Sequence, residues 1–233
     1  MENRPVPTYT SLVPSRNKGR SATEPVSDHT AGRLSVYLRC LTTLEAAGVK
    51  TISSGALAQR FHLNAAQIRK DLAYFGEFGV RGVGYYVDEL KTHLRAILGL
   101  ERPVRVGIIG AGNLGRALAD YPGFRLEGFA IVALFDTDPE RIGRQSRESV
   151  PIRRMDEFKT MACAGEIDIV VVAVPGDAAQ SVVDLAVNCG LKAILNFSPG
   201  AIQVPPRVKL KNVDLTVSLE SLSFFLARGG SDA

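Results

Sequence analysis

Residues 104–115 read V-R-V-G-I-I-G-A-G-N-L-G, and this stretch decides the fold of the chain. A run rich in β-branched residues leads into Gly110, Gly112 and Gly115, and a helical segment follows. Gly110 permits a tight turn off the strand, Gly112 lets the backbone approach a pyrophosphate, and Gly115 lets the helix pack closely on the strand. The free N–H groups at the start of that helix favour a phosphate. The stretch therefore predicts a dinucleotide-binding site on an α/β fold.

A second apolar strand supports this prediction, because it ends in an acidic residue at the required spacing. The segment A-I-V-A-L-F-D-T-D covers residues 130–138, and Asp136 lies 21 residues after Gly115. A carboxylate here can accept both hydroxyl groups of an adenosine ribose and would repel a 2′-phosphate, which favours NAD(H) over NADP(H). A CoA-binding module also uses a glycine turn on a parallel sheet and is an alternative. Asp136 and Asp138 fit the ribose of NAD better than the 3′-phosphorylated ribose of CoA.

Length and composition describe an ordinary soluble protein. The chain has 233 residues, of which 45% are hydrophobic, and this is enough for two small domains with separate cores. No apolar run reaches the length of a membrane span, and the first residues lack the apolar core of a signal peptide. The three cysteines are far apart, so neither a disulfide framework nor a zinc site is indicated. We therefore expect a cytoplasmic protein without a bound metal or a membrane partner.

Positive charge is concentrated before the glycine motif. Residues 1–100 carry a net charge of +5 and residues 101–233 a net charge of −1, out of the total of +4. This asymmetry indicates a polyanionic partner for the N-terminal part, although a similar charge is common on ordinary surfaces. Residues 1–29 are rich in Pro, Ser, Thr and Arg and have no apolar period, which predicts a disordered tail whose basic residues could touch DNA.

Three helices are predicted after this tail. Thr30 would cap the first, which runs to about residue 47, and Ser53 or Ser54 would cap a short second helix. Asn64 would cap the third, and Gly76 would stop it. Two short helices joined by a tight turn form a helix-turn-helix, here over about residues 35–74.

The third helix has two predicted faces. Ile68, Leu72 and Phe75 would pack inward, while the opposite face is polar. Lys and Arg can pair with phosphates or guanine, and Gln with adenine, so the polar face is typical of a recognition helix. A solvated face with Gln67–Asp71 pairing is the alternative. The predicted polar face comprises Gln67, Lys70, Asp71 and Tyr74, with Arg69 beside them.

A glycine-rich hairpin follows the third helix. Gly79, Gly82 and Gly84 punctuate it, and Arg81 lies near its tip, as in the wing of a winged helix. A last helix would start at the cap Asp88 and end near residue 100. The predicted DNA contacts are Ser53, Ser54, Gln67, Arg69, Lys70 and Arg81.

The chain resembles the Rex family of redox-sensing transcriptional repressors. The resemblance is carried by Q-I-R-K-D-L-A-Y-F-G-E-F-G-V-R-G-V-G-Y, G-A-G-N-L-G-R-A-L-A-D-Y-P-G-F, F-D-T-D-P-E-R-I-G, V-A-V-P-G-D-A-A-Q, L-K-A-I-L-N-F-S-P and V-D-L-T-V-S-L-E-S-L-S-F-F, in this order. It covers about residues 30–227. Ser198 departs from the family, since many members have alanine there, and the tail before residue 30 is unusually long.

The resemblance implies a homodimer that binds double-stranded operator DNA when NADH is scarce. NADH would close the Rossmann domains and release the DNA, while NAD would compete without triggering release. The loop after residues 169–173 would line the middle of the cofactor, and residues 196–197 would lie near the nicotinamide; a plain loop and a core aromatic are the alternatives. The implied cofactor contacts are Gly110, Ala111, Gly112, Asn113, Leu114, Gly115, Asp136, Asp138, Val174, Pro175, Asn196 and Phe197.

The last helix is apolar and has two possible roles. It could cover the edge of its own sheet, or it could cross to the partner subunit as a domain-swapped dimer interface, as the resemblance implies. The resemblance also implies a switch in which Arg39 pairs with Asp214 in one state and Tyr121 competes for Asp214. The predicted boundaries are 1–29 for the tail, 30–100 for the winged helix, 101–216 for the Rossmann domain, and 217–233 for the swapped helix and tail.

An NAD-dependent oxidoreductase with an accessory helical domain is the alternative function. Hydride transfer to a carbonyl needs a positioned acid or base, usually His, Lys or Tyr. His29, His62 and His93 all precede the glycine motif, and the lysines after it form no recognisable relay. The sequence therefore favours a sensor over an enzyme.

Overall fold

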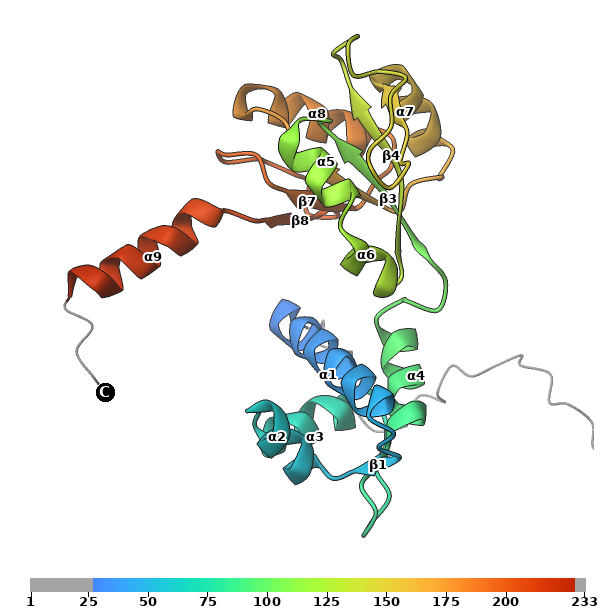
Figure 1. Ribbon diagram of the computed structural model, residues 1–233, viewed down its shortest axis with the longest axis vertical. Helices are drawn as coiled ribbons and strands as arrows, with labels where there is room; N and C mark the ends of the chain where they lie inside the picture. The colour runs from blue at the N-terminus through green and yellow to red at the C-terminus, as the bar shows by residue number, and fades with distance from the viewer. Residues whose placement is uncertain (1–26, 229–233) are drawn as a thin grey trace, which may run out of the picture. The chain divides into compact units, whose positions relative to one another are not determined.

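The computed structural model describes residues 27–228. They form two compact units that divide after Glu101 (Figure 1). The predicted basic arm before residue 27 lies outside the described residues, as does the predicted tail after residue 228.

The first unit is a winged helix. Its helices are α1 (Asp28–Ala46), α2 (Ser54–Phe61), α3 (Ala65–Phe75) and α4 (Val87–Ile97), and its strands β1 (Thr51–Ile52) and β2 (Tyr85–Tyr86) pair antiparallel. α1 packs against α4, and α2 against α3. The leucines of α1 repeat every three or four residues, so they fall on one face and reach the core. The fully buried side chains include Leu34, Leu41, Leu44, Leu57, Ile68, Leu72, Leu90 and Leu94.

Helix caps were predicted with mixed success. The Ser53 and Asn64 caps are confirmed, since the Ser53 hydroxyl accepts from Ala56 N–H and the Asn64 side chain from Ala66 N–H and Gln67 N–H. The Thr30 cap is wrong: Ser27 caps α1, so the helix starts inside the predicted tail. The Asp88 cap is also wrong, because α4 begins at Val87 and Asp88 lies in its first turn. In both cases an acceptor lies beside the true start, and cap patterns alone do not separate neighbouring positions.

The second unit is built on one parallel sheet. Six strands of residues 102–228 lie in the order β5-β4-β3-β6-β7-β8. From β3 the chain adds β4 and β5 on one side, and then β6, β7 and β8 on the other side. The strand order therefore reverses between β3 and β6, which is the topological switch point of a doubly wound Rossmann sheet. The strands are β3 (Val104–Ile109), β4 (Phe129–Asp136), β5 (Ile152–Arg154), β6 (Ile169–Val172), β7 (Ala193–Asn196) and β8 (Lys209–Asn212).

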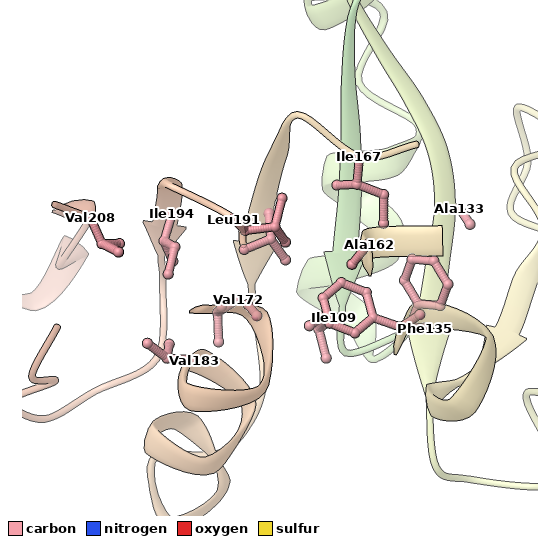
Figure 2. Close-up of a cluster of buried hydrophobic side chains, with 13 residues drawn as sticks. Ile109, Ala133, Phe135, Ala162, Ile167, Val172, Val183, Leu191, Ile194 and Val208 are labelled. Atoms are coloured by element: carbon pink, nitrogen blue, oxygen red, sulfur yellow. The ribbon is translucent and has the colours of Figure 1, made fainter. Parts of the chain in front are cut away.

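Helices cover both faces of this sheet. The helices are α5 (Asn113–Ala119), α6 (Pro122–Leu126), α7 (Met155–Cys163) and α8 (Gly176–Asn188). Apolar side chains of α7 and α8 meet those of the strands in one core cluster, and Figure 2 shows these side chains gathered in a single layer. A second cluster lies under α5 and includes Ile108, Ala119 and Leu134. Because both faces are buried, the central strands are mostly apolar rather than alternating, with Arg105 near the start of β3 as an exception.

The last helix, α9 (Leu215–Ala227), has a different environment. All its residues are exposed, including large apolar side chains. The alternative in which α9 covers the edge of its own sheet is therefore wrong for this structure.

Candidate functional site

The glycine turn after β3 has the geometry of a dinucleotide loop. Gly110 has φ +101°, and a Cβ there would lie 2.3 Å from the carbonyl oxygen of Ala173. A Cβ on Gly115 would lie 1.8 Å from the carbonyl oxygen of Gly110, so α5 can pack on the turn only without a side chain. Nothing lies within 4 Å of a Cβ built on Gly112, which leaves its backbone open to a ligand. The tight turn at Gly110 and the close helix packing at Gly115 are thus as their spacing predicts, while the pyrophosphate contact of Gly112 stays a prediction.

Around this turn, Asn113 and Leu114 are exposed and Ala111 is fully buried. Ala111 donates its N–H to the Asp136 carboxylate over 2.7 Å. The acidic end of β4 is therefore tied to the glycine turn of β3.

Asp136 is more enclosed than the sequence suggested. Its carboxylate also accepts hydrogen bonds from the N–H groups of Thr137 and Asp138, and it pairs with Arg141 over 3.1 Å. Burial acts to raise the pKa of Asp136, but these hydrogen bonds outweigh it and hold the pKa below its ordinary value. With these partners and an exposed fraction of 8%, the Asp136 carboxylate is part of the turn structure. A ribose hydroxyl would have to donate to an oxygen that already accepts hydrogen bonds from the protein.

Asp138 is the more accessible acid at this edge. Its side chain is 34% exposed and pairs with Arg141 Nε over 3.0 Å. Arg141 thus pairs with both acids. The sequence analysis assigned no role to Arg141, although it lies in the F-D-T-D-P-E-R-I-G string quoted above. Its signal was a cation three residues after Asp138, within reach of the same carboxylates.

Polar groups also gather at the carboxyl ends of β6 and β7. Val174 is half-buried and Pro175 exposed, whereas Asn196 is 1% exposed and Phe197 packs against the core under α5. Ser198 donates its hydroxyl to the carbonyl oxygen of Val174 over 2.6 Å. The structure therefore brings these two loops together at the same sheet edge as the glycine turn, because all the strands are parallel.

The recognition helix needs one correction. Asp71 was predicted on its polar outer face but is 4% exposed, in the core between α1 and α3. Its carboxylate accepts from Arg33 Nε over 2.6 Å and Nη2 over 2.8 Å, from the Tyr37 hydroxyl over 2.9 Å, and from Gln67 Nε2 over 2.7 Å. With these partners, the Asp71 carboxylate is not available to a DNA base.

This cluster changes the ionisation of its members. Burial opposes the charged form of Asp71, but the hydrogen bonds from Arg33, Gln67 and Tyr37 outweigh it and lower the pKa of Asp71. Burial, followed by the hydrogen bond to Asp71, raises the pKa of Tyr37 to about 12. The sequence reading missed Arg33 and Tyr37; their signal was two polar residues spaced four apart beside the apolar stripe of α1.

The other predicted DNA contacts lie on the surface. Lys70 and Arg69 are exposed, and Arg69 donates to the Ser54 hydroxyl over 2.9 Å. A hollow of about 500 Å³ separates the start of α2 from the wing loop, and it brings together four of the six predicted residues: Ser53, Ser54, Arg69 and Arg81. Lys70 and Gln67 lie outside its lining.

The predicted switch residues fall in different units. Arg39 is exposed on α1 of the first unit. In the second unit, Asp214 caps α9 through Thr216 N–H at 2.8 Å, and the exposed Tyr121 ring packs edge-on against Phe124. Their pairing stays a prediction.

Within residues 27–228, no three metal-ligating side chains gather in one place. In the same part of the chain, none of the helices has both the length and the apolar character needed to cross a bilayer.

Two family models match the chain. The model described as CoA binding domain matches residues 101–200, and the model described as putative DNA-binding protein N-terminus matches residues 25–73. The two matches fall on the sheet-containing unit and on the helical unit respectively.

The chain matches curated relatives over nearly their full length. A redox-sensing transcriptional repressor Rex from Desulfitobacterium hafniense is 47% identical over 201 residues, which cover 85% of this chain and 94% of the relative. Another, from Syntrophomonas wolfei, is 49% identical over 202 residues and covers 87% and 96%.

Solved structures agree with these relatives. RSP in complex with β-NAD+ and operator DNA superposes with a TM-score of 0.82 at 40% identity, covering 88% of this chain and 94% of that one. RSP in complex with β-NADH gives 0.76 at 38% identity, covering 88% and 96%. The similarity thus spans both units.

Proposed function

This chain belongs to the Rex family of redox-sensing transcriptional repressors, and we propose how its two units divide that function. It is a DNA-binding repressor that senses the balance of NADH and NAD+. The winged helix holds the operator, and the Rossmann unit binds the dinucleotide. NADH binding favours a conformation that releases the operator, whereas NAD+ occupies the same site without causing release.

One observation carries this proposal: a DNA-reading unit and a nicotinamide-dinucleotide fold occur in one chain that matches Rex repressors over 94% of their length. The family model that matches residues 101–200 is described as a CoA binding domain, so CoA is the alternative ligand. The solved relatives hold NAD+ or NADH, and the Asp136–Asp138–Arg141 edge suits a ribose without a 3′-phosphate.

For the cofactor site, we propose three groups of contacts. The turn from Gly110 to Gly115 holds the pyrophosphate, with Asn113 and Leu114 at its open side. The edge after β4 holds the adenosine ribose. The loop at Val174–Pro175 lines the middle of the cofactor and the loop at Asn196–Phe197 lies near the nicotinamide, because both loops are on the other side of the switch point.

For the operator, we propose that Lys70 and Gln67 face the major groove while Arg69, Arg81, Ser53 and Ser54 contact the backbone around the wing. The hollow that these four line supports the second part. Phosphate contacts of this kind set the position on DNA, and contacts to base edges set the sequence.

We also propose that the repressor is a homodimer joined through α9, which would seat its apolar side chains on a second copy. The Arg39–Asp214 pair and its competitor Tyr121 would then link the two units to the dimer. The chain works in the compartment that holds operator DNA, which we take to be the cytoplasm. It binds NADH without turning it over, since its histidines all precede the dinucleotide unit.

A mobility-shift titration tests the proposed function. The purified chain is bound to a duplex from its own promoter region, and NADH or NAD+ is added at constant salt, because phosphate contacts make affinity salt-dependent. NADH should release the duplex and NAD+ should not. Equal behaviour of the two dinucleotides would contradict redox sensing, and release by CoA in place of NADH would favour the CoA-binding alternative.

A further inference from the structure

A hydrogen-bond network, buried except at Asn212, joins the ends of β6, β7 and β8. The Ser198 hydroxyl donates to the carbonyl oxygen of Val174 over 2.6 Å, and Ser198 N–H donates to Asn196 Oδ1 over 3.0 Å. Asn196 Nδ2 donates to the carbonyl oxygen of Ser198 over 2.9 Å and to Asn212 Oδ1 over 3.0 Å. Asn196 and Ser198 are 1% and 7% exposed, so water does not compete strongly for these bonds.

The two loops in this network are held unusually close. A Cβ on Gly176 would lie 2.9 Å from the carbonyl oxygen of Pro199, so the segment after β6 touches the segment after β7 where only a glycine fits. The Ser198 hydroxyl bond lies beside this contact. The position of the Val174 loop is therefore set by Ser198 and by the backbone packing next to it.

The place of these loops follows from the topology. The adenosine half of a dinucleotide lies toward β4, where Asp136 ends the strand and Asp138 follows it, and the pyrophosphate lies at the turn after β3. The nicotinamide half must then extend across the switch point toward β6 and β7. This step rests on the proposed function.

The network continues to the base of α9. Val213 donates its N–H to the Asn196 carbonyl oxygen over 2.8 Å, directly after Asn212. The next residue, Asp214, caps α9. A shift of the Asn196 loop therefore moves the chain at the point where α9 begins.

We propose that Ser198 is a positioning residue for the nicotinamide half of the dinucleotide, and that its network through Asn196 and Asn212 connects that half to the base of α9. Because the Ser198 hydroxyl donates to the backbone of the Val174 loop and not to the ligand itself, it tunes the affinity of this chain for the dinucleotide. Asn212, on the edge strand β8, affects the response to the cofactor more than the binding of it.

The first test compares NADH with ADP-ribose, which has the same adenosine and pyrophosphate but no nicotinamide. In calorimetry, Ser198→Ala should weaken NADH binding by about fivefold, the worth of one ordinary hydrogen bond, and leave ADP-ribose binding unchanged. Ser181→Ala is the matched control, because its hydroxyl also donates to a backbone carbonyl, that of Ala178, but on the exposed side of α8. Equal loss for both ligands, or no loss for NADH, would overturn the positioning role.

The second test uses Asn212→Ala, an exposed position where folding is not at risk. NADH binding should stay within about twofold of wild type, while the NADH concentration that releases operator DNA should rise by about three- to tenfold. Release at the wild-type concentration would overturn the connection to α9. If the wild-type chain does not release DNA with NADH, the proposed function fails. If the wild-type chain does release DNA and the variants do not differ from it, only this inference fails.

Discussion

Asp71 and Asp136 are buried carboxylates whose hydrogen-bond partners are groups of the protein itself. Sequence position predicted that both could face a ligand, and both turn out to accept several hydrogen bonds from the protein itself. Spacing identified Asp136 as the acid that ends β4, and this is confirmed. The sequence could not show where the oxygens of Asp136 point, because that depends on Arg141 and on the N–H group of Ala111, 25 residues earlier.

The Asp71 cluster is expected to stabilise the winged helix. Asp71→Asn keeps the volume but leaves Arg33 without its charged partner, so the free energy of unfolding should fall by about 1–3 kcal/mol. Operator binding should weaken with it, since α3 loses its tie to α1. Asp156→Asn, which breaks the exposed pair with Arg154, is the control and should change stability little. Denaturant unfolding of both variants is the measurement, and equal stabilities would contradict the anchoring role.

The same cluster gives a pH dependence. The folded pKa of Asp71 is lowered, so its contribution to stability is complete above about pH 4, the ordinary carboxyl value, and is lost as the pH falls through the folded pKa. The stability difference between wild type and Asp71→Asn should therefore be constant near neutral pH and narrow in acid. A difference that grows in acid would show that another group is responsible.

Asp138 is expected to decide between NADH and NADPH. Asp138→Asn removes the accessible charge and leaves Arg141 less neutralised, which should favour a 2′-phosphate and narrow the preference for NADH by about tenfold. Asp136→Asn should weaken both dinucleotides together, because it loosens the glycine turn. Calorimetric affinities for the four combinations are decisive. A change of preference only in Asp136→Asn would mean that Asp136 reads the ribose.

At the scale of the elements, the sequence predicted most of the fold. The long apolar runs and glycine stops identified α1, α2, α3, β3 and β4, because these signals are local. The two-residue strands β1 and β2 were not predicted, since their pairing joins Thr51 to Tyr86 across a long stretch of chain. The hollow beside the wing could not be predicted from the sequence either, because it forms only where Ser53, Arg69 and Arg81 come together in space.

The α3 helix and the wing carry the prediction on DNA. Lys70→Ala or Arg69→Ala should weaken operator binding by about 1–3 kcal/mol and leave NADH affinity unchanged, because both side chains are exposed on the helical unit. Arg154→Ala, an exposed arginine on the other unit, controls for lost charge. The measurement is a mobility shift at matched salt, and two variants with wild-type affinity would exclude α3 as the recognition helix.

At the scale of the whole molecule, α9 is the element that a single chain leaves without cover. Phe225→Asp places a charge on an apolar position that is 59% exposed in the single chain, and it should convert a dimer into a species of 25.1 kDa. Ser221→Asp adds the same charge at a polar position of the same helix. Sedimentation equilibrium distinguishes the two species. If both variants and the wild type had the same mass, α9 would not be the dimer contact.

In this repressor the dinucleotide site and the operator site are expected to be coupled. A ligand shifts a conformational equilibrium only by its differential affinity for the two states, and the coupling must be reciprocal. Operator DNA should therefore weaken NADH binding by the same factor by which NADH weakens operator binding, a free energy of about 1–3 kcal/mol. NAD+ should show a much smaller coupling. Arg39→Ala should reduce the coupling more than it reduces NADH affinity.

The most direct measurement is the dissociation constant of NADH, followed by its fluorescence, with and without saturating operator duplex. We expect NADH binding to be weaker on the operator, by about 5- to 150-fold, and to change little when a duplex of unrelated sequence is added at the same salt concentration. An NADH dissociation constant that is the same on and off the operator would contradict this coupling, even if the chain binds both ligands tightly.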